Sequence, residues 1–287
     1  MKHTAAPRRR GARLDCPAVS RPITFLSDYG LADEFAGACR AVIARIAPGV
    51  HVIDISHGVP RHDVARGAAA LANALPFAPA GVHLAVVDPG VGSERRAVAV
   101  RVAAEERVMV GPDNGLFGEA IELFGGAVEA VDIGRSPVRL EPVSATFHGR
   151  DIFAPVAAHL ALGMSLTAVG EPLDPAELFM LERPAPRVEA AGLSATVGYV
   201  DTFGNATVIA DDAAATEAGL AAGANVLIQA GGEAYDARYA LTFADVEPGE
   251  LVVYLNSSGG LAIAVNQGSA AERLGIVAGD QVVLRPA

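Results

Sequence analysis

The sequence predicts an α/β protein with two domains, the first built on a mostly parallel sheet and the second on antiparallel strands. In the first half of the chain, short apolar runs alternate with segments whose apolar residues recur at helical spacing. This alternation is typical of an α/β sandwich, in which helices cover both faces of a largely parallel sheet. Near residue 171 the pattern changes to short alternating segments separated by turn residues, which favours an antiparallel sheet or a small barrel.

The first domain is expected to contain strands and helices in regular alternation. Strands are expected at residues 22–26, 50–55, 82–87, 97–102, 107–110 and 128–132. Helices are expected at residues 33–47 and 63–76, after the turn at 111–115, and at residues 153–162. Asp63 is suited to cap the second helix, and Pro48–Gly49 ends the first. One face of the first helix carries the apolar residues Phe35, Ala38, Val42, Ile43 and Ile46.

Changes in composition mark the domain boundaries. Residues 1–20 form a basic extension with three consecutive arginines and no apolar core, and we expect this extension to be disordered. The α/β domain then spans residues 21–170, a proline-rich linker residues 171–190, and the β domain residues 191–287. Within the β domain, strands are expected at residues 193–200, 206–209, 225–229, 233–239, 251–255, 261–265 and 281–284.

The composition indicates a folded chain and excludes some classes of partner. The 287 residues are 51% hydrophobic and 19% charged, which suits two domains with large cores. The net charge of −11 argues against nucleic acid as a partner, because backbone phosphates need a cationic face. Two cysteines, Cys16 and Cys39, are too few for a disulfide framework, and no apolar run is long enough to span a membrane. We therefore expect a cytoplasmic protein with no membrane partner.

The candidate site begins where the strand at residues 82–87 ends at Asp88, followed by a Pro-Gly-Val-Gly turn and two arginines, Arg95 and Arg96. Ligands of open α/β sheets bind beyond the carboxyl ends of the strands, and a carboxylate with a guanidinium there can orient water and stabilise charge. Parallel strands would bring several further polar residues to the same edge, and a later segment adds an imidazole. These residues are Asp28, Asp54, His57, Asp113, Asn114 and His148. Taken singly, Asp-Gly and Asn-Gly pairs are equally typical of plain turns.

Other chemistries have less support in the sequence. No HxxxH or HExxH pair occurs, and Arg95 near Asp88 would repel a cation, so we expect no metal. The Gly90–Gly92 turn lacks the spacing of a phosphate-binding loop. A serine nucleophile has no GxSxG elbow, and neither cysteine has an activating histidine beside it in the sequence.

Two loops of the second domain have the composition of ligand-binding loops. Asp201–Asn205 follows a strand and offers an aromatic face and an amide that can pair with the edge of a heterocycle. Asn256–Gly260 follows another strand and offers hydroxyls and backbone N–H groups that suit a carboxylate. Each loop is also consistent with a simple turn. Residues 269–283 are similar to a segment of PDZ modules, but no carboxylate-binding loop precedes them.

Taken together, these motifs resemble the S-adenosyl-L-methionine hydroxide adenosyltransferases, relatives of the fluorinases and chlorinases. The resemblance covers about residues 22–285 and rests on long motifs in the same order. The motifs are residues 27–30 (SDYG), 54–57 (DISH), 87–92 (VDPGVG), 112–115 (PDNG), 146–155 (TFHGRDIFAP), 203–205 (FGN) and 256–257 (NS). The resemblance implies hydrolysis of S-adenosyl-L-methionine to adenosine and methionine, without a cofactor. It also implies a β-barrel-like second domain and a homotrimer whose active sites lie between subunits.

The resemblance also implies roles for individual residues. The catalytic set falls on Asp88, Arg95 and His148, with Arg95 stabilising the developing hydroxide and the other two orienting the water and accepting its proton. Asp28 would bind the ribose hydroxyls. The remaining substrate-binding residues are His62, Asn114, Asp201, Phe203, Asn205, Phe243, Ser257 and Ser258, of which Asp201, Ser257 and Ser258 hold the methionine end, Phe203 and Phe243 pack on adenine, and Asn205 reads its edge.

Alternatives to hydrolysis differ at identifiable positions. The halogenase relatives replace the residues at Asp88 and His148 and carry serine where this chain has Gly149, and a carboxylate at Asp88 would repel a halide. We therefore favour hydrolysis over halogenation. A non-catalytic adenosine-binding sensor and a metal-dependent hydrolase are the other hypotheses. The chain departs from the family pattern at His62, Gly260 and Ala262, which affects the expected affinity more than the reaction type.

Overall fold

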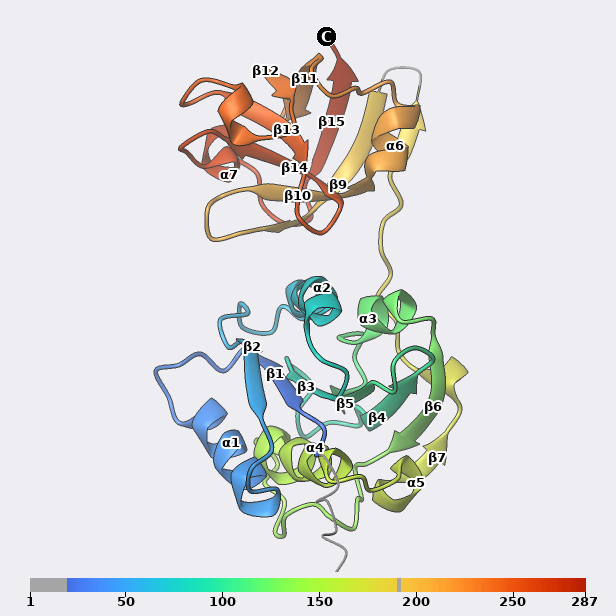
Figure 1. Ribbon diagram of the computed structural model, residues 1–287. Coiled ribbons are helices and arrows are strands. Elements are labelled where there is room, and N and C mark those ends of the chain that lie inside the picture. Colours follow the sequence, from blue (N-terminus) through green and yellow to red (C-terminus); the bar gives the residue numbers. More distant parts are fainter. Residues whose placement is uncertain (1–19, 190–191) are drawn as a thin grey trace, which may run out of the picture. The chain divides into compact units, whose positions relative to one another are not determined.

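The structure is a computed structural model that describes residues 20–189 and 192–287. The expected basic extension and Cys16 therefore lie outside the described residues, apart from Ser20. The described chain forms two compact units, each with its own sheet (Figure 1). The first unit contains residues up to Gly58, Phe77–Asp113 and Ile121–Leu178, and the second contains Val59–Pro76, Asn114–Ala120 and Phe179–Ala287.

A seven-stranded sheet forms the centre of the first unit. Its strands are β1 (Ile23–Ser27), β2 (Val52–Ser56), β3 (Val82–Val86), β4 (Ala97–Val102), β5 (Val108–Pro112), β6 (Ala127–Asp132) and β7 (Glu171–Leu173). They lie in the order β2-β1-β3-β5-β4-β6-β7. The first four in this order are parallel, and the pairs β5–β4, β4–β6 and β6–β7 are antiparallel. Five of the seven strands therefore run in one direction, which confirms the expected mostly parallel sheet.

Helices α1 (Phe35–Ile46) and α4 (Ala154–Ala161) pack against each other, and α4 also contacts β1 and β3 (Figure 1). The apolar face expected for α1 contacts the core in part. Ile43 is buried and Val42 and Ile46 pack against the core, whereas Phe35 is 38% exposed and packs on the Tyr29 and Phe147 rings. The other buried residues of α1 are Ala36 and Cys39.

Helix α2 (Val64–Ala74) begins where the sequence predicts. The Asp63 side chain accepts a hydrogen bond from the Arg66 backbone N–H at 2.9 Å, as an N-cap should. A short 3₁₀ turn, η1 (Leu75–Phe77), follows. Helix α3 (Gly118–Leu123) follows the turn at 111–115, and α5 (Leu166–Val169) precedes β7.

The second unit is built on an antiparallel barrel-like sheet. Its strands are β8 (Arg187–Glu189), β9 (Gly192–Val200), β10 (Ala206–Asp211), β11 (Asn225–Ala230), β12 (Glu233–Tyr239), β13 (Leu251–Leu255), β14 (Gly260–Val265) and β15 (Gln281–Pro286). The order is β10-β14-β13-β12-β11-β15-β9-β8, and an additional β10–β9 pairing closes seven strands into a ring. All pairs are antiparallel except β12–β13. Short helices α6 (Asp212–Glu217) and α7 (Ala270–Leu274) and the 3₁₀ turn η4 (Phe243–Asp245) lie between strands.

The proline-rich segment 171–190 carries short elements that the sequence does not predict. Strand β7 at its start pairs with β6, the 3₁₀ turn η3 (Pro175–Glu177) follows, and β8 pairs with β9. Three-residue strands are too short to give a period in the sequence, so only their pairing partners identify them.

A buried polar chain crosses the sheet at the middle of β1 and β3. Thr24 Oγ1 lies 2.8 Å from His83 Nδ1, and Arg107 Nη1 lies 3.2 Å from His83 Nε2. Because a guanidinium only donates, Nε2 accepts from Arg107, and Nδ1–H donates to the threonine hydroxyl. Burial, followed by the charge of Arg107, lowers the pKa of His83 to about 3, so this imidazole is neutral.

The Asp63 cap gives a test of the fold. Replacing Asp63 by Ala should lower the free energy of unfolding by about 1 kcal/mol, because the Arg66 N–H loses its acceptor. Asp63→Asn is the matched control, since its amide oxygen can still accept. Urea unfolding followed by circular dichroism measures both, and equal stability of the Ala variant and the native chain would contradict the assigned cap.

Candidate functional site

Four parallel strands end at the same edge of the first sheet. Ser27 of β1 lies opposite Val86 of β3, and Leu26 lies opposite Ser56 of β2. This register brings the residues that follow each strand to one edge, as the sequence analysis expected. The polar residues there are Asp28 after β1, His57 after β2, Asp88 after β3 and Asp113 after β5.

A buried ion pair between Asp88 and Arg95 is the central feature of this edge. Arg95 Nε donates to Asp88 Oδ1 at 3.0 Å, and Nη2 donates to Oδ2 at 2.5 Å. The two side chains are only 6% and 8% exposed. Arg95 Nη1 also donates to the backbone carbonyl of Arg96 at 2.9 Å, so the guanidinium is held on two sides. Such a bidentate pair fixes both the position and the plane of the cation.

His148 joins this pair from a distant part of the chain. Its Nδ1 lies 3.3 Å from Arg95 Nη2. Since the guanidinium only donates, Nδ1 accepts, and a neutral imidazole then carries its proton on Nε2. The structure thus brings together the three residues expected to form the catalytic set.

The π-helix η2 (Gly149–Phe153) follows His148 directly and leads into α4. In this wider turn the Ala154 N–H donates to the Gly149 carbonyl, five residues earlier. The Phe153 ring lies 5.5 Å from the Arg95 guanidinium carbon, so the same turn contributes an apolar face to the cation. The expected helix began only at residue 153, because a single wide turn leaves no periodic signal in the sequence.

Burial sets the protonation of the site. Burial raises the pKa of Asp88 above its ordinary value, although the adjacent Arg95 charge and hydrogen bonds oppose this shift. Burial, followed by the charge of Arg95, lowers the pKa of His148. Both oxygens of Asp88 accept hydrogen bonds from Arg95, so this pair consists of a carboxylate and a cation, and the lowered pKa of His148 favours a neutral imidazole beside it.

Tyr29 is a residue of this region that the sequence analysis did not select. A Cβ atom added to Gly149 would lie 2.1 Å from the Tyr29 hydroxyl oxygen, so the hydroxyl occupies the space above Gly149. The Tyr29 ring packs edge-on against Phe147 at 5.8 Å and against Phe35. Burial raises the pKa of Tyr29 well above 10.0, and Asp28 and Asp88 act in the same direction. The motif at residues 27–30 contains Tyr29, but only the packing shows its position.

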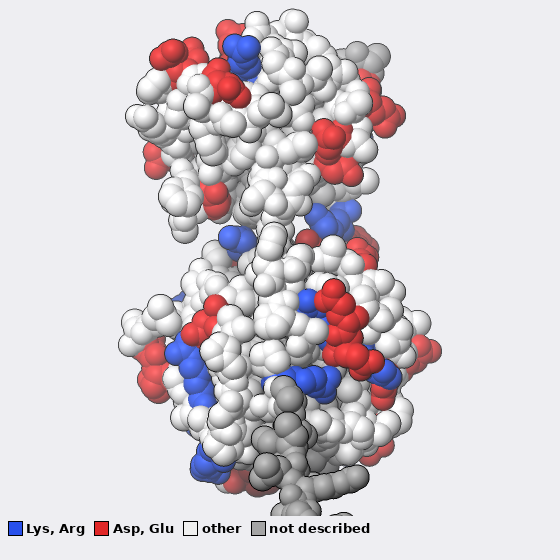
Figure 2. Space-filling model, viewed as in Figure 1, with Lys and Arg blue, Asp and Glu red and all other residues white. Residues whose placement is uncertain are grey.

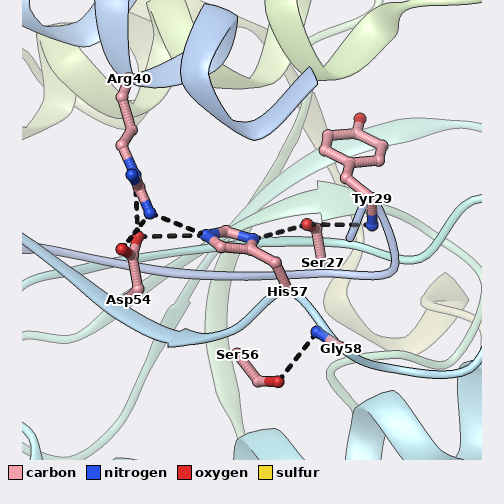
Figure 3. Close-up of polar contacts among 7 residues, drawn as sticks. All are labelled: Ser27, Tyr29, Arg40, Asp54, Ser56, His57 and Gly58. Carbon is pink, nitrogen blue, oxygen red and sulfur yellow. Dashed lines mark hydrogen bonds and ion pairs between the residues drawn. The ribbon is translucent and has the colours of Figure 1, made fainter. Parts of the chain in front are cut away.

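Two residues that the sequence analysis grouped with Asp88 are engaged elsewhere. Asp113 pairs with Arg96, whose Nε donates to Asp113 Oδ2 at 2.9 Å. Asp54 pairs with Arg40 of α1 and with His57, on the side of β2 that faces α1 (Figure 3). The two consecutive arginines thus serve different carboxylates, and only Arg95 belongs to the set around Asp88.

The loop after β9 in the second unit is built around Asp201. Its Oδ1 accepts from the backbone N–H groups of Phe203 at 2.8 Å and Asn205 at 2.9 Å, and its Oδ2 accepts from Asn205 Nδ2 at 2.9 Å. Asp201 therefore orders the turn in which Phe203 is 78% exposed. This loop can therefore be both a structural turn and a binding loop, because the ordered turn exposes the phenyl ring of Phe203.

The other predicted binding residues lie on loops and turns. In the second unit, Phe243 begins η4 and packs against Tyr254 in a tilted arrangement, with ring centroids 4.9 Å apart. Ser257 and Ser258 form an exposed turn between β13 and β14. Asn114 Oδ1 accepts from the Leu116 N–H at 3.2 Å. His62, before α2, has a left-handed backbone with φ of 65°. In the first unit, Asp28 directly follows β1.

The described surface carries mixed charge. On the face shown in Figure 2, arginine side chains lie among aspartate and glutamate side chains in each unit. Among residues 20–189 and 192–287, no three His, Cys, Asp or Glu side chains are grouped so that they can hold a metal ion. No helix in the described part of the chain is both long and apolar enough to cross a bilayer.

Comparison with known proteins relates both parts of the chain to one family. The profile described as the SAM hydroxide adenosyltransferase N-terminal domain matches residues 23–170, and the corresponding C-terminal domain profile matches residues 195–283. A protein named (R)-S-adenosyl-L-methionine hydrolase from Salinispora tropica is 48% identical over 91% of this chain and 96% of its own length. A protein of the same name from Thermus thermophilus is 41% identical over 92% of this chain and 99% of its own length.

More distant relatives and solved structures extend the comparison. A fluorinase from an Actinoplanes species is 30% identical over 94% of this chain and all of its own length. The crystal structure of an uncharacterized conserved protein from Thermotoga maritima superposes with a TM-score of 0.85 at 37% identity, covering 92% of this chain and 99% of that protein. The fold and the similarity therefore extend over nearly the whole chain.

The close approach of two loops at Gly92 is testable through stability. Gly92 has φ of +78°, and a Cβ there would lie 2.5 Å from the Ala145 carbonyl oxygen in the loop that leads to His148. Gly92→Ala should lower the free energy of unfolding by roughly 1–2 kcal/mol from the backbone and about 1–3 kcal/mol more from the collision. Gly49→Ala is the matched control, because Gly49 has φ of +91° and nothing within 4 Å. Equal losses in urea unfolding would contradict the close approach.

Proposed function

The chain belongs to the S-adenosyl-L-methionine hydroxide adenosyltransferase family, and we propose that it is an enzyme that hydrolyses S-adenosyl-L-methionine to adenosine and L-methionine. The observation that carries this proposal is the buried pair of Asp88 and Arg95, joined by the half-buried His148, at the carboxyl edge of the sheet. Relatives at 41% and 48% identity bear the hydrolase name, whereas the fluorinase relative is less similar.

The proposed reaction is a single in-line displacement at the ribose C5′ carbon. The water oxygen forms a bond to C5′ while the C5′–S bond breaks, and the electron pair of the C5′–S bond leaves with the sulfur. The leaving group becomes a neutral thioether and needs no general acid, so the protein must place the water in line and take up one proton. Substrate and water are the only reactants that this step requires.

Arg95 is the residue best placed to stabilise the oxygen as it becomes hydroxide-like. Asp88 holds the guanidinium in one plane, and the Phe153 ring shields one side of it. A cation that is already fixed and dry gains strength from the low dielectric of its surroundings and needs no reorganisation during the reaction. Asp88 thus contributes by orienting Arg95 as well as by facing the water.

Asp88 and His148 are the two groups that can accept the proton. Asp88 has a raised pKa and is therefore a stronger proton acceptor than an exposed carboxylate. The lone pair of the neutral His148 imidazole lies on Nδ1, which faces Arg95, so His148 accepts a proton there only when its contact with Arg95 opens. Because both contact Arg95, they titrate as one coupled unit, and we assign the proton to the pair.

Substrate recognition is proposed for the loops of both units. We assign the ribose hydroxyls to Asp28, the adenine face to Phe203 and Phe243, and the adenine edge to Asn205. The methionine end is assigned to Asp201, Ser257 and Ser258. We also propose that His62 and Asn114 bind the substrate. The exposed Phe203 ring supports the stacking role.

The assembly and domain plan are proposed from the family resemblance. We propose a cytoplasmic homotrimer in which each active site combines residues of two subunits. We also propose the division into domains 21–170 and 191–287, and the two family profiles, which cover residues 23–170 and 195–283, support it.

Two features support hydrolysis rather than halogenation. The Asp88 carboxylate would repel a halide at the position of the water. The Tyr29 hydroxyl occupies the space that a serine side chain at position 149 needs, and the resemblance places a halide-holding serine there in the halogenases. The Tyr29 phenol and the Asp88 carboxylate therefore occupy the space in which a halide would have to bind.

Incubation with S-adenosyl-L-methionine tests the function directly. Both sulfonium epimers are supplied, and adenosine and methionine are followed by chromatography against the spontaneous rate. We expect equal amounts of both products, faster from the (R) epimer for which the relatives are named. Binding of adenosine without turnover would indicate a sensor, and loss of turnover on chelation would indicate a metal-dependent hydrolase.

Arg95→Lys tests the role of the guanidinium. Lysine keeps a positive charge but cannot form the bidentate pair with Asp88, so kcat should fall by at least about 100-fold. The Kd for adenosine, measured by calorimetry, should change little, because the nucleoside lacks the developing charge. Arg96→Lys is the matched control on the neighbouring ion pair with Asp113 and should keep kcat near the native value. Equal losses in kcat and in adenosine affinity for Arg95→Lys would contradict the assignment.

The pH dependence of kcat/KM follows from the direction of the pKa shifts. His148 must be neutral to accept a proton, and its pKa lies below the ordinary value of 6.5, so the active form predominates at neutral pH. The rate should be level from pH 7 upward and should fall only as the pH drops below about 6.5. His148→Asn should change the position of this acidic limb. A decline that begins above pH 7 on acidification would contradict the neutral imidazole.

A further inference from the structure

The buried imidazole of His57 lies at the same edge of the sheet as the Asp88 set but belongs to a different network. Its Nδ1 lies 2.7 Å from Ser27 Oγ, and its Nε2 lies 3.1 Å from Asp54 Oδ1 (Figure 3). His57 is 4% exposed and Ser27 is fully buried. Asp54 is in turn held by Arg40, whose Nε donates to Oδ1 at 3.0 Å. The reaction proposed above uses none of these side chains.

The network links His57 to the backbone of the turn on one side and to α1 on the other. The Tyr29 backbone N–H can only donate, and it lies 3.3 Å from Ser27 Oγ, so the serine oxygen accepts this hydrogen bond. The same serine hydroxyl shares a proton with His57 Nδ1. His57 Nε2 lies 3.1 Å from Asp54 Oδ1 and 3.3 Å from Arg40 Nη2, so the imidazole is held between the Ser27 hydroxyl and the Arg40–Asp54 pair.

The network contacts the turn after β1 on both sides of Asp28. Before Asp28, the His57 imidazole holds the Ser27 hydroxyl, which binds the Tyr29 N–H. After Asp28, the His57 carbonyl accepts from the Gly30 N–H at 2.7 Å. One residue therefore uses its side chain and its backbone to fix the two ends of the four-residue segment from Ser27 to Gly30, and Asp28 lies within that segment.

We propose that His57 is a positioning residue for ribose recognition, acting through Ser27 and the Gly30 N–H to hold Asp28 where its carboxylate meets the ribose diol. This inference rests on the proposed function, in which Asp28 binds the ribose hydroxyls. Two hydroxyl groups on adjacent carbons need a carboxylate at one place and in one plane, because small misplacements weaken both hydrogen bonds together. The anchor of the network is Asp54, fixed to α1 by Arg40.

The same strand offers a control for a purely structural role. Thr24 of β1 makes an equivalent buried hydroxyl–imidazole contact with His83 at 2.8 Å. Thr24 lies three residues before Ser27, in the interior of the strand and on the opposite face, away from the Asp28 turn. Loss of either hydroxyl removes a buried hydroxyl–imidazole contact from β1, but only loss of the Ser27 hydroxyl also removes the acceptor of the Tyr29 N–H and so releases the turn.

The experiment compares the binding of adenosine and 2′-deoxyadenosine to the full chain by calorimetry. The measured quantity is the ratio of the Kd for 2′-deoxyadenosine to the Kd for adenosine. In the native protein this ratio should be roughly 10 to 100, the range for a hydrogen bond to a charged group. Asp28→Asn, Ser27→Ala and His57→Gln should each lower the ratio by roughly tenfold. Thr24→Val should leave the ratio unchanged even where it lowers the melting temperature.

The outcomes separate this inference from the proposed function. Failure of the native protein to bind either nucleoside would count against the proposed function itself. Native discrimination that survives in Ser27→Ala and His57→Gln would overturn the positioning role, as would a ratio insensitive to Asp28→Asn. A fall of the ratio in Thr24→Val equal to that in Ser27→Ala would also overturn it. Ser27→Ala, which removes one oxygen atom, carries the test if His57→Gln does not fold.

Discussion

The buried ion pair between Asp88 and Arg95 is the interaction on which the candidate site depends. Two charges removed from water are stable only when each satisfies the other with good geometry, and the bidentate contact provides this. The requirement fixes the length and shape of the loop between the two residues. It also leaves Arg95 Nη2 able to reach a third group, and the loop that carries His148 supplies that group.

The arrangement of the sheet explains why these residues can meet. Parallel pairing of β1, β2, β3 and β5 brings four carboxyl ends to one edge without any special loop. The contribution of His148 is different, because it comes from a segment outside the sheet that must approach the loop after β3 closely. Glycine at position 92 permits this approach, since the Ala145 carbonyl oxygen lies where a side chain of residue 92 would have to be.

Sequence reasoning located the strands, the Asp63 cap and the strand-end residues, because each depends on a local pattern or a short range of the chain. The family resemblance, and no residue pattern, selected Arg95 over Arg96, since the turn after Asp88 decides which of the two arginines reaches that carboxylate. On α1 the position of Phe35 differs from the expected face, because its ring packs among aromatic neighbours. The position of Tyr29 over Gly149 and the strands β7 and β8 depend on contacts between distant segments, which no single-sequence pattern records.

The π-helix at Gly149–Phe153 has a consequence for how the chain can vary. A residue in an α-helix turns by about 100°, and a single wide turn holds one residue more than an ordinary one. Loss of one residue from this turn would convert it to a regular helix while α4 kept its packing. The side chain at position 148 would then swing away from Arg95 by about that angle. The number of residues between His148 and α4 is therefore constrained as strictly as the identity of the histidine, and insertions or deletions in this short span should be tolerated far less than substitutions.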